Sequence, residues 1–293
     1  MSIHNFNQDL VDDLARGRVA LFLGAGVSAS AVTTTGNRIS GWTDFLEKVC
    51  TKAPKSIQKT AKKLIKSNDL LLACELLKSS MSEEWESILM AEFSQNADPS
   101  PLHKSILDLN QRIIITTNFD KLLERAYETF KNDTRFSLIT LQSVEEDAFR
   151  ALKDHDRNYI IKLHGSIDRS ESIIFTKSEY IGKAIWNFHY NSFLESILLN
   201  FTVLFIGFSM NDPAVSSILE MYATKYPKSR PHYLFTPEKS DKSVDSIMKK
   251  LRKTSMIYYD GSGGHEKLPA VIQELARKMT ERRKEILAEM IAR

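Results

Sequence analysis

The chain has 293 residues, of which 42% are hydrophobic and 26% are charged, values close to those of ordinary soluble globular proteins. Its 40 basic and 37 acidic residues leave a net charge of +3, too weak a field to predict direct nucleic-acid binding. Two cysteines, Cys50 and Cys74, cannot build a disulfide framework or a four-thiolate zinc site, so we expect no metal.

The N-terminal segment MSIHNFNQDLVDDLARG alternates acidic and apolar residues and lacks the basic and hydrophobic regions of a signal peptide. No apolar run in the sequence approaches the roughly 20 residues that cross a bilayer. We therefore expect a cytoplasmic protein that has no contact with a membrane.

Short β-branched or aliphatic runs recur along the chain, most of them separated by amphipathic stretches. Near-continuous apolar strands that alternate with helices are typical of a parallel sheet covered on both faces. The sequence therefore predicts an α/β fold with a Rossmann-like, doubly wound and mainly parallel sheet. The predicted strands are residues 18–23, 112–116, 159–163, 202–206, 232–235 and 255–259.

The long interval between the first two predicted strands has helical patterns around residues 42–50, 56–66, 70–78 and 83–93. The sequence DPSP at residues 98–101 then breaks the pattern, because proline disfavours helix at the residue before it. We therefore predict three parts: residues 1–36 begin the core, residues 37–100 form a helical insertion module, and residues 101–293 complete the core.

The last predicted helix, over residues 267–291, carries an apolar face that continues to its end at Ile286, Leu287, Met290 and Ile291. This end is more apolar than a free tail needs. Two explanations stay open: a contact between subunits of a homo-oligomer, or simple packing on the core.

A glycine turn follows the first predicted strand in the sequence LFLGAGVSA, residues 21–29. Gly24 and Gly26 allow the backbone to approach a pyrophosphate, and the start of the next helix offers unpaired N–H groups. The alternative is a tight strand-to-helix turn that happens to contain glycine. A dehydrogenase would place an acidic ribose ligand about 20 residues later, where Asp44 and Glu47 fall inside a helical pattern. Hydride transfer is therefore disfavoured.

The second motif is IIITTNFD, residues 113–120, an apolar strand that ends in polar side chains. Ligands bind at the carboxyl ends of strands in open α/β sheets, which places Asn118 and Asp120 within reach of a nucleotide. For Asp120, helix capping is an equally good explanation.

Two further strands also end in polar motifs. In YIIKLHGSID, residues 159–168, the apolar strand ends at His164. This position is suited to proton transfer, although a lone histidine is often structural. In FIGFSMNDP, residues 205–213, the buried strand ends in glycine and small polar residues, among them Gly207 and Ser209. The Ser209 hydroxyl can bind a phosphate or a ribose. Asp212 is a better candidate than Asn211 for the cap of the helix that follows.

The ordered set GAGVS, TTNFD, LHGSID and IGFSMNDP, which lies within residues 18–213, resembles the SIR2-like family, which is related to sirtuins and includes bacterial NAD⁺ hydrolases of antiphage defence. The resemblance implies a Rossmann-like sheet with NAD⁺ across the carboxyl ends of its strands. It implies that His164 is the catalytic histidine and that Asn118 and Asp120 lie at the nicotinamide-ribose site. The other implied contacts are Gly24, Ala25, Gly26 and Ser28 at the pyrophosphate, Gly207 and Ser209 at a phosphate or the adenosine ribose, and, without a supporting motif, Tyr259, Asp260 and Gly261 beside adenine.

Two departures separate the chain from sirtuin deacylases. No cysteine follows residue 74, so the four-cysteine zinc module is missing, and ISGWTDF at residues 39–45 replaces the proline-containing sirtuin loop. We therefore predict hydrolysis of NAD⁺ to nicotinamide and ADP-ribose. In this hypothesis Asn118 orients a water or ribose hydroxyl, neutral His164 acts as general base, and Asp120 holds the ribose or Asn118. The alternatives are a subunit that senses NAD⁺ or ADP-ribose, and a deacylase or ADP-ribosyltransferase.

The same resemblance implies that NAD⁺ depletion stops phage propagation by abortive infection, an activity that must be restrained in an uninfected cell. The chain consists almost wholly of the SIR2-like domain, without an evident sensor domain. We therefore expect a homo-oligomer and a separately encoded partner, such as a HerA-type ATPase.

Overall fold

A computed structural model describes residues 4–34, 36, 38–81, 83–131, 137–237 and 241–292. Residues 1–3 of the N-terminal segment and residue 37, where we place the start of the helical module, lie outside this part of the chain. Among the helices within it, none combines the length and the apolar character needed to cross a membrane.

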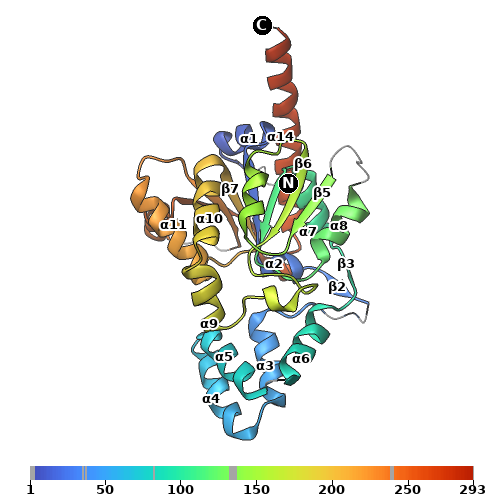
Figure 1. Cartoon of the computed structure of the whole chain (residues 1–293). Helices are drawn as coiled ribbons and strands as arrows, with labels where there is room; N and C mark the ends of the chain where they lie inside the picture. The colour runs from blue at the N-terminus through green and yellow to red at the C-terminus, as the bar shows by residue number, and fades with distance from the viewer. Residues whose placement is uncertain are drawn as a thin grey trace.

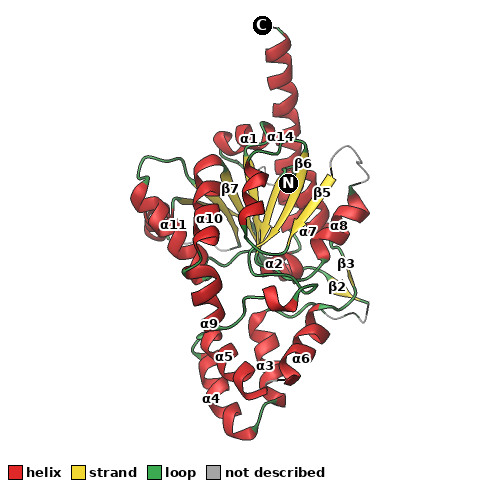
Figure 2. Cartoon of the chain, in the orientation of Figure 1, coloured by secondary structure: helices red, strands yellow, loops and turns green. Residues whose placement is uncertain are grey.

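A seven-stranded parallel sheet forms the centre of the molecule (Figure 2). Its strands are β1 (Val19–Leu23), β4 (Ile113–Thr116), β5 (Ser137–Leu141), β6 (Arg157–Lys162), β7 (Thr202–Ile206), β8 (His232–Thr236) and β9 (Thr254–Tyr258). They lie in the order β5-β6-β4-β1-β7-β8-β9, so the chain builds one side of β1 and then the other. In a doubly wound sheet such a reversal opens a crevice at the carboxyl ends of the strands, where ligands bind.

The predicted doubly wound α/β fold is confirmed, and each of the six predicted runs forms a strand. Strand β5 was not predicted. It pairs with β6 at one edge of the sheet, and its five residues are exposed or half-buried. An edge strand of this kind lacks the continuous buried run that marks the central strands.

Helices cover both faces of the sheet (Figure 1). Successive residues of a strand point to opposite faces, so Leu21 and Leu23 join one core and Ala20 and Phe22 join the other. The first core is closed by α1 (Gln8–Ala15), α7 (Pro101–Asp108), α8 (Leu122–Phe130) and α14 (Leu268–Ile291). The second core is closed by α10 (Phe188–Asn200) and α11 (Pro213–Lys225), with α12 (Lys242–Arg252) beside α11 and β9.

Four helices form a group beyond the carboxyl edge of the sheet, at the bottom of Figure 1. They are α3 (Trp42–Lys52), α4 (Lys55–Lys66), α5 (Leu70–Met81) and α6 (Glu83–Phe93), which confirms the four predicted helices. Phe45 lies 5.4 Å from the ring of Phe175, and Phe93 lies 4.8 Å from Phe119, so the group packs on the loops that follow β4 and β6. The assignment of residues 37–100 as a separate module stays a prediction.

Short elements join these layers. Two strands of two residues each, β2 (Val32–Thr33) and β3 (Ala97–Asp98), pair antiparallel where the chain enters and leaves the four helices. The segment between β6 and α10 contains η2 (Ser170–Ser172), α9 (Lys177–Glu179) and η3 (Tyr180–Ile185), the last a π-helix. Such turns are rare and often mark functional positions. The other short helices are α2 (Ala25–Ser28), η1 (Glu146–Leu152) and α13 (Ser262–His265).

Candidate active site

The carboxyl ends of β1, β4, β6 and β7 lie at one level of the sheet. Leu23 pairs with Thr116 of β4 on one side and with Ile206 of β7 on the other, and Thr116 pairs with Lys162 of β6. The polar residues of the four predicted motifs follow these positions directly. Their loops therefore emerge at the same edge, at the point where the strand order reverses.

The loops after β1 and β7 touch through their backbones. The Gly26 N–H donates to the carbonyl oxygen of Gly207 at 2.9 Å, and the Gly24 N–H donates to that of Ile206 at 3.0 Å. Gly207 has φ +61°, a left-handed conformation that favours glycine. The close contact between the two loops by itself explains why glycine is needed at positions 24, 26 and 207. The role of these glycines at a pyrophosphate stays a prediction. Ala25, Gly26 and Ser209 are exposed at this edge.

Replacing Gly24 by alanine tests the contact between the two loops. A Cβ at this position would lie 2.5 Å from the Gly207 oxygen and 2.7 Å from the Phe208 Cα, both backbone atoms. We expect Gly24→Ala to lower the free energy of unfolding by about 1–3 kcal/mol and to weaken NAD⁺ binding, because the loops must separate. Urea unfolding and calorimetric titration with NAD⁺ measure the two effects.

Gly41→Ala is the matched control, since a Cβ there would meet the Asp44 carboxylate at 3.8 Å, an ordinary contact. Gly41 is the N-cap of α3, where alanine is less favourable than glycine, so we expect this variant to lose less stability than Gly24→Ala and to bind NAD⁺ like the wild type. Wild-type stability and NAD⁺ affinity in Gly24→Ala would show that the loops are not held together as described.

Asn118, Ser28 and Asp120 form one buried hydrogen-bonded group. The Asn118 Nδ2 donates to the Gly24 oxygen at 3.0 Å and to Ser28 Oγ at 2.7 Å, and Ser28 Oγ donates to Asp120 Oδ2 at 2.5 Å. Asp120 Oδ1 also accepts the Leu122 N–H at 2.9 Å, at the start of α8. Asp120 therefore makes the kind of bond expected of a helix cap while its second oxygen joins the site, and its role at a ribose stays a prediction.

A buried lysine, which the sequence analysis did not single out, supports this group. Lys162 is fully buried, and its Nζ donates to the Asp120 carbonyl oxygen at 2.6 Å and lies 2.8 Å from Glu124 Oε1. Lysine is almost never fully buried unless it is paired. The signal in the sequence was a single cation inside the apolar run YIIKL.

His164 is 3% exposed and is surrounded by polar groups from later parts of the chain. Tyr180 Oη lies 3.2 Å from Nδ1, while Tyr190 Oη and Asp212 Oδ2 lie 3.4 Å and 3.3 Å from Nε2. Burial lowers the pKa of His164, and the nearby Asp212 carboxylate opposes that shift. The ring is therefore held neutral near pH 7 beside an anion that can stabilise its charged form.

Asp212 does more than the sequence analysis expected. Its Oδ1 accepts the Val215 N–H at 3.0 Å, which confirms the predicted cap of α11. Its Oδ2 accepts the Tyr180 hydroxyl at 2.8 Å and faces His164. Tyr180 and Tyr190 were missed altogether, because buried aromatic residues in a helical segment look like ordinary core.

The groups around Asn118 and His164 lie on neighbouring loops. The Leu163 N–H donates to the Thr116 oxygen and the Ile167 N–H donates to the Phe119 oxygen, both at 2.8 Å. These backbone bonds place the loops after β4 and β6 side by side.

The candidate adenine residues lie further away, after β9, which is separated from β7 by β8. Tyr259 Oη lies 3.0 Å from His265 Nδ1, and Asp260 forms an ion pair with Lys267. Their role at adenine stays a prediction.

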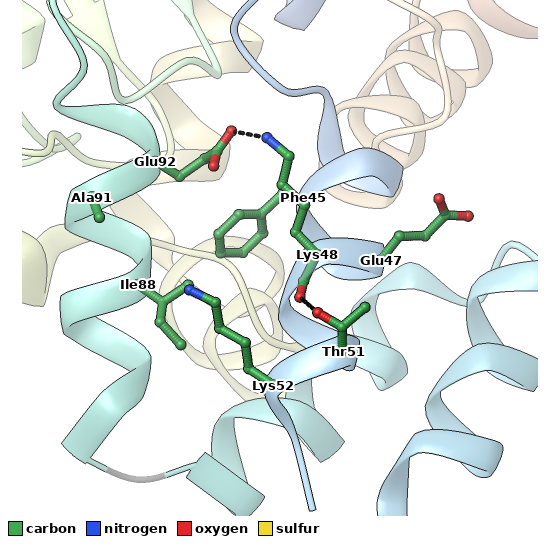
Figure 3. Close-up of a pocket in the computed structure, with 8 residues that line it drawn as sticks. All are labelled: Phe45, Glu47, Lys48, Thr51, Lys52, Ile88, Ala91 and Glu92. Carbon is green, nitrogen blue, oxygen red and sulfur yellow. Dashed lines mark hydrogen bonds and ion pairs between the residues drawn. The ribbon is translucent and has the colours of Figure 1, made fainter. Parts of the chain in front are cut away.

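A hollow of about 500 Å³ lies away from these motifs, among the helices beyond the sheet. Figure 3 shows that α3 and α6 line it, with Lys48 and Glu92 forming an ion pair at 2.8 Å across its upper part. None of the predicted site residues lines the hollow. We place the candidate site by the register of the strand ends instead, because that register gathers the polar motifs.

The sequence of this chain is similar to those of bacterial proteins, two of which follow. The NAD(+) hydrolase ThsA of Bacillus cereus (strain MSX-D12) is 25% identical over 249 residues, which cover 83% of this chain and 48% of the relative. The defense-associated sirtuin 2 of Bacillus subtilis is 24% identical over 266 residues, covering 87% of this chain and 23% of the relative. The chain thus spans about half or less of the length of these two relatives.

A family model described as a SIR2-like domain matches residues 112–258, half of the chain. The matched region contains strands β4 to β9 and three of the four motifs, and β1 with the glycine turn completes the sheet. The chain belongs to the SIR2-like family.

Proposed function

We propose that this chain hydrolyses NAD⁺ to nicotinamide and ADP-ribose. The observation that carries the proposal is that the Asn118 group and the buried His164, whose pKa is lowered by burial, lie on neighbouring loops at the reversal point of the sheet. Ligands bind at this position in open α/β sheets. Two relatives of similar sequence, named NAD(+) hydrolase ThsA and defense-associated sirtuin 2, support the choice of substrate.

In the proposed reaction the bond between ribose C1′ and the nicotinamide nitrogen breaks, and nicotinamide leaves with the bonding electrons as a neutral pyridine. Little acid catalysis is therefore needed. Asn118 orients a water, directly or through a ribose hydroxyl, and His164 accepts a proton from this water as the water oxygen bonds to C1′, which gives ADP-ribose. A base must be neutral before it reacts, and the lowered pKa of His164 meets that requirement.

The remaining residues bind the dinucleotide in this proposal. Gly24, Ala25, Gly26 and Ser28 lie along the pyrophosphate, Asp120 lies at the nicotinamide ribose, and Gly207 with Ser209 meets a phosphate or the adenosine ribose. The exposed backbone at Ala25 and Gly26 supports this assignment.

A second candidate is an NAD⁺- or ADP-ribose-sensing subunit of a larger assembly. One observation favours it: both ring nitrogens of His164 face protein groups, and the ring is 3% exposed. A sensor and a repressed enzyme would both have this closed arrangement, and turnover separates them. A deacylase is less well supported, because the sequence lacks the four-cysteine module.

We further propose that the chain acts in antiphage defence by depleting NAD⁺, in the cytoplasm, and that a separately encoded partner such as a HerA-type ATPase controls it. The name defense-associated sirtuin 2 supports the defence role.

We also propose a homo-oligomer that forms through the end of α14. Arg282 pairs with Asp12 of α1 at 2.9 Å and Ile286 is still buried in the core, whereas the C-terminal end of α14 projects from the molecule (Figure 1). Leu287, Met290 and Ile291 share one face of that end and are 53%, 68% and 86% exposed. Changing Leu287 and Met290 together to glutamate should reduce the mass measured by light scattering to that of a monomer. An unchanged mass would place any subunit contact elsewhere.

The direct test is to incubate the purified chain with NAD⁺, alone and with the product of the neighbouring gene, and to measure nicotinamide and ADP-ribose. Equal amounts of both products identify an NAD⁺ hydrolase. Binding of NAD⁺ without product under either condition identifies a sensor.

A further inference from the structure

The ring of His164 is held by groups that the sequence motifs do not explain. Tyr180 belongs to the π-helix η3, Tyr190 to α10, and Asp212 to the cap of α11. Tyr180 is the centre of the arrangement, because its hydroxyl lies 3.2 Å from His164 Nδ1 and donates to Asp212 Oδ2 at 2.8 Å.

Counting protons along these contacts assigns the tautomer of His164. A tyrosine hydroxyl has one proton, and Tyr180 uses it toward Asp212. His164 Nδ1 must then be the donor to the Tyr180 oxygen. A neutral imidazole has one N–H, so Nε2 is left as the acceptor, facing the hydroxyl of Tyr190 at 3.4 Å.

The Asp212 carboxylate is held so that its Oδ2 lies beside His164 Nε2. Its Oδ1 is used by the Val215 N–H at 3.0 Å, which keeps Oδ2 directed toward the ring, 3.3 Å from His164 Nε2. A carboxylate at this distance stabilises the imidazolium, in which Nε2 is protonated as well as Nδ1, whereas burial disfavours this charged ring. Nε2 is thus the basic nitrogen of the ring, and the Asp212 carboxylate beside it can stabilise the positive charge when Nε2 takes up a proton.

We propose that Tyr180 and Asp212 are positioning residues for His164: Tyr180 holds the ring as the Nδ1–H tautomer, and Asp212 stabilises the imidazolium formed at Nε2. The inference rests on the proposed NAD⁺ hydrolysis. In that reaction the attacking water gives a proton to Nε2 as its oxygen bonds to C1′, nicotinamide leaves with the electrons of the broken bond, and the imidazolium returns the proton to solvent. The attacking water takes the place of Tyr190 Oη at Nε2, because the Tyr190 contact, at 3.4 Å, is the longest of the three.

The titratable groups that face the ring are Tyr180, Tyr190 and Asp212. Burial and then the charge of Asp212 raise the pKa of both tyrosines well above the usual value, so both remain hydroxyls. Cys74 of α5 interacts with Tyr180, and burial raises the pKa of its thiol as well. Asp212 is therefore the charge in this set that acts on His164.

Two variants with matched controls test the roles by kinetics. Asn caps helices as well as Asp does, so Asp212→Asn keeps the cap and removes the charge. Tyr180→Phe keeps the ring and removes the hydroxyl. We expect each variant to lower kcat by roughly 10²-fold or more with KM nearly unchanged. Because the Asp212 charge raises the pKa of His164, its loss should also move the acid limb of kcat/KM to lower pH.

The controls make equivalent changes elsewhere. Asp241→Asn alters the cap of α12, where the carboxylate accepts the Ser243 N–H at 2.7 Å. Tyr159→Phe removes a buried tyrosine hydroxyl that donates to Asp154 at the opposite end of β6. Both should keep wild-type kcat and pH profile. The inference would be overturned if Asp212→Asn and Tyr180→Phe lost no more activity than these controls and the pH profile did not move.

Nitrogen-15 NMR of the His164 ring gives a readout that needs no turnover, with the signal assigned by its loss in His164→Ala. The wild type should show the Nδ1–H tautomer, and Tyr180→Phe should shift it toward Nε2–H. A wild-type ring protonated on Nε2, or a ring unaffected by Tyr180→Phe, would refute the assignment. The expected tautomer in a chain that releases no nicotinamide under any condition would leave the ring assignment standing and reject the proposed function.

Discussion

Substituting His164 by alanine will lower nicotinamide release from NAD⁺ by roughly 10²–10⁴-fold, the range that removal of a general base produces. Because burial lowers the pKa of His164, the wild-type base stays neutral below the usual histidine value of 6.5. Activity should therefore persist as the pH falls through 6.5 and decline only when the ring becomes protonated. Initial rates of nicotinamide and ADP-ribose formation across this pH range measure both effects.

Removing the ring also removes the contacts that Tyr180 and Asp212 make with it. Folding of the variant must therefore be checked by circular dichroism and urea unfolding. His164→Gln is a second variant that retains more of the side-chain volume and cannot act as a base at this pH. His155→Ala is the control, because His155 is exposed, and should leave the rate unchanged. Asn118→Ala should lose turnover as His164→Ala does. Normal turnover in both would remove these residues from the mechanism.

Replacing Lys162 by methionine will destabilise the protein by about 3–5 kcal/mol, the usual cost of removing one partner from a buried ion pair. The Nζ of Lys162 lies 2.8 Å from Glu124 Oε1 and donates to the Asp120 oxygen at 2.6 Å. Without the cation, the Glu124 carboxylate, 14% exposed, has lost its charged partner. The loop that holds Asn118 and Asp120 also loses a support, so NAD⁺ turnover should fall in addition to stability. Urea unfolding measures the first effect.

The double variant Lys162→Met with Glu124→Gln should recover a large part of the lost stability, because no unpaired charge remains buried. The surface pair of Lys225 and Glu195, at 3.0 Å with Lys225 48% exposed, supplies the comparison. Lys225→Met should change the free energy of unfolding very little, because solvent screens a surface pair. If Lys162→Met cost no more than Lys225→Met, Lys162 would not be the buried, paired cation described here.

The layers of the fold were predictable because they rest on local patterns. Apolar runs such as VALFL at residues 19–23 are buried on both faces, and few structures other than a central parallel strand require that. Edge strand β5 escaped prediction because its half-buried residues resemble a loop. The motifs ending in Asn118 and His164 were likewise visible, since polar residues directly after a buried strand mark the ligand-binding edge of an α/β sheet.

The environment of those motifs depended on contacts between distant segments. The role of Lys162 depends on its contacts with Asp120 and Glu124, which lie after a different strand. The roles of Tyr180 and Tyr190 depend on their contacts with the ring of His164. Asp212 could be predicted as a helix cap, because capping involves neighbouring residues, whereas its contact with His164 joins two separate strand ends. By itself, then, the sequence determined the strand and helix pattern, the polar residues at the strand ends and the family resemblance. The tertiary structure alone decided which groups surround His164 and Asp120, because the order of strands in a sheet, and not their order in the chain, sets which loops meet.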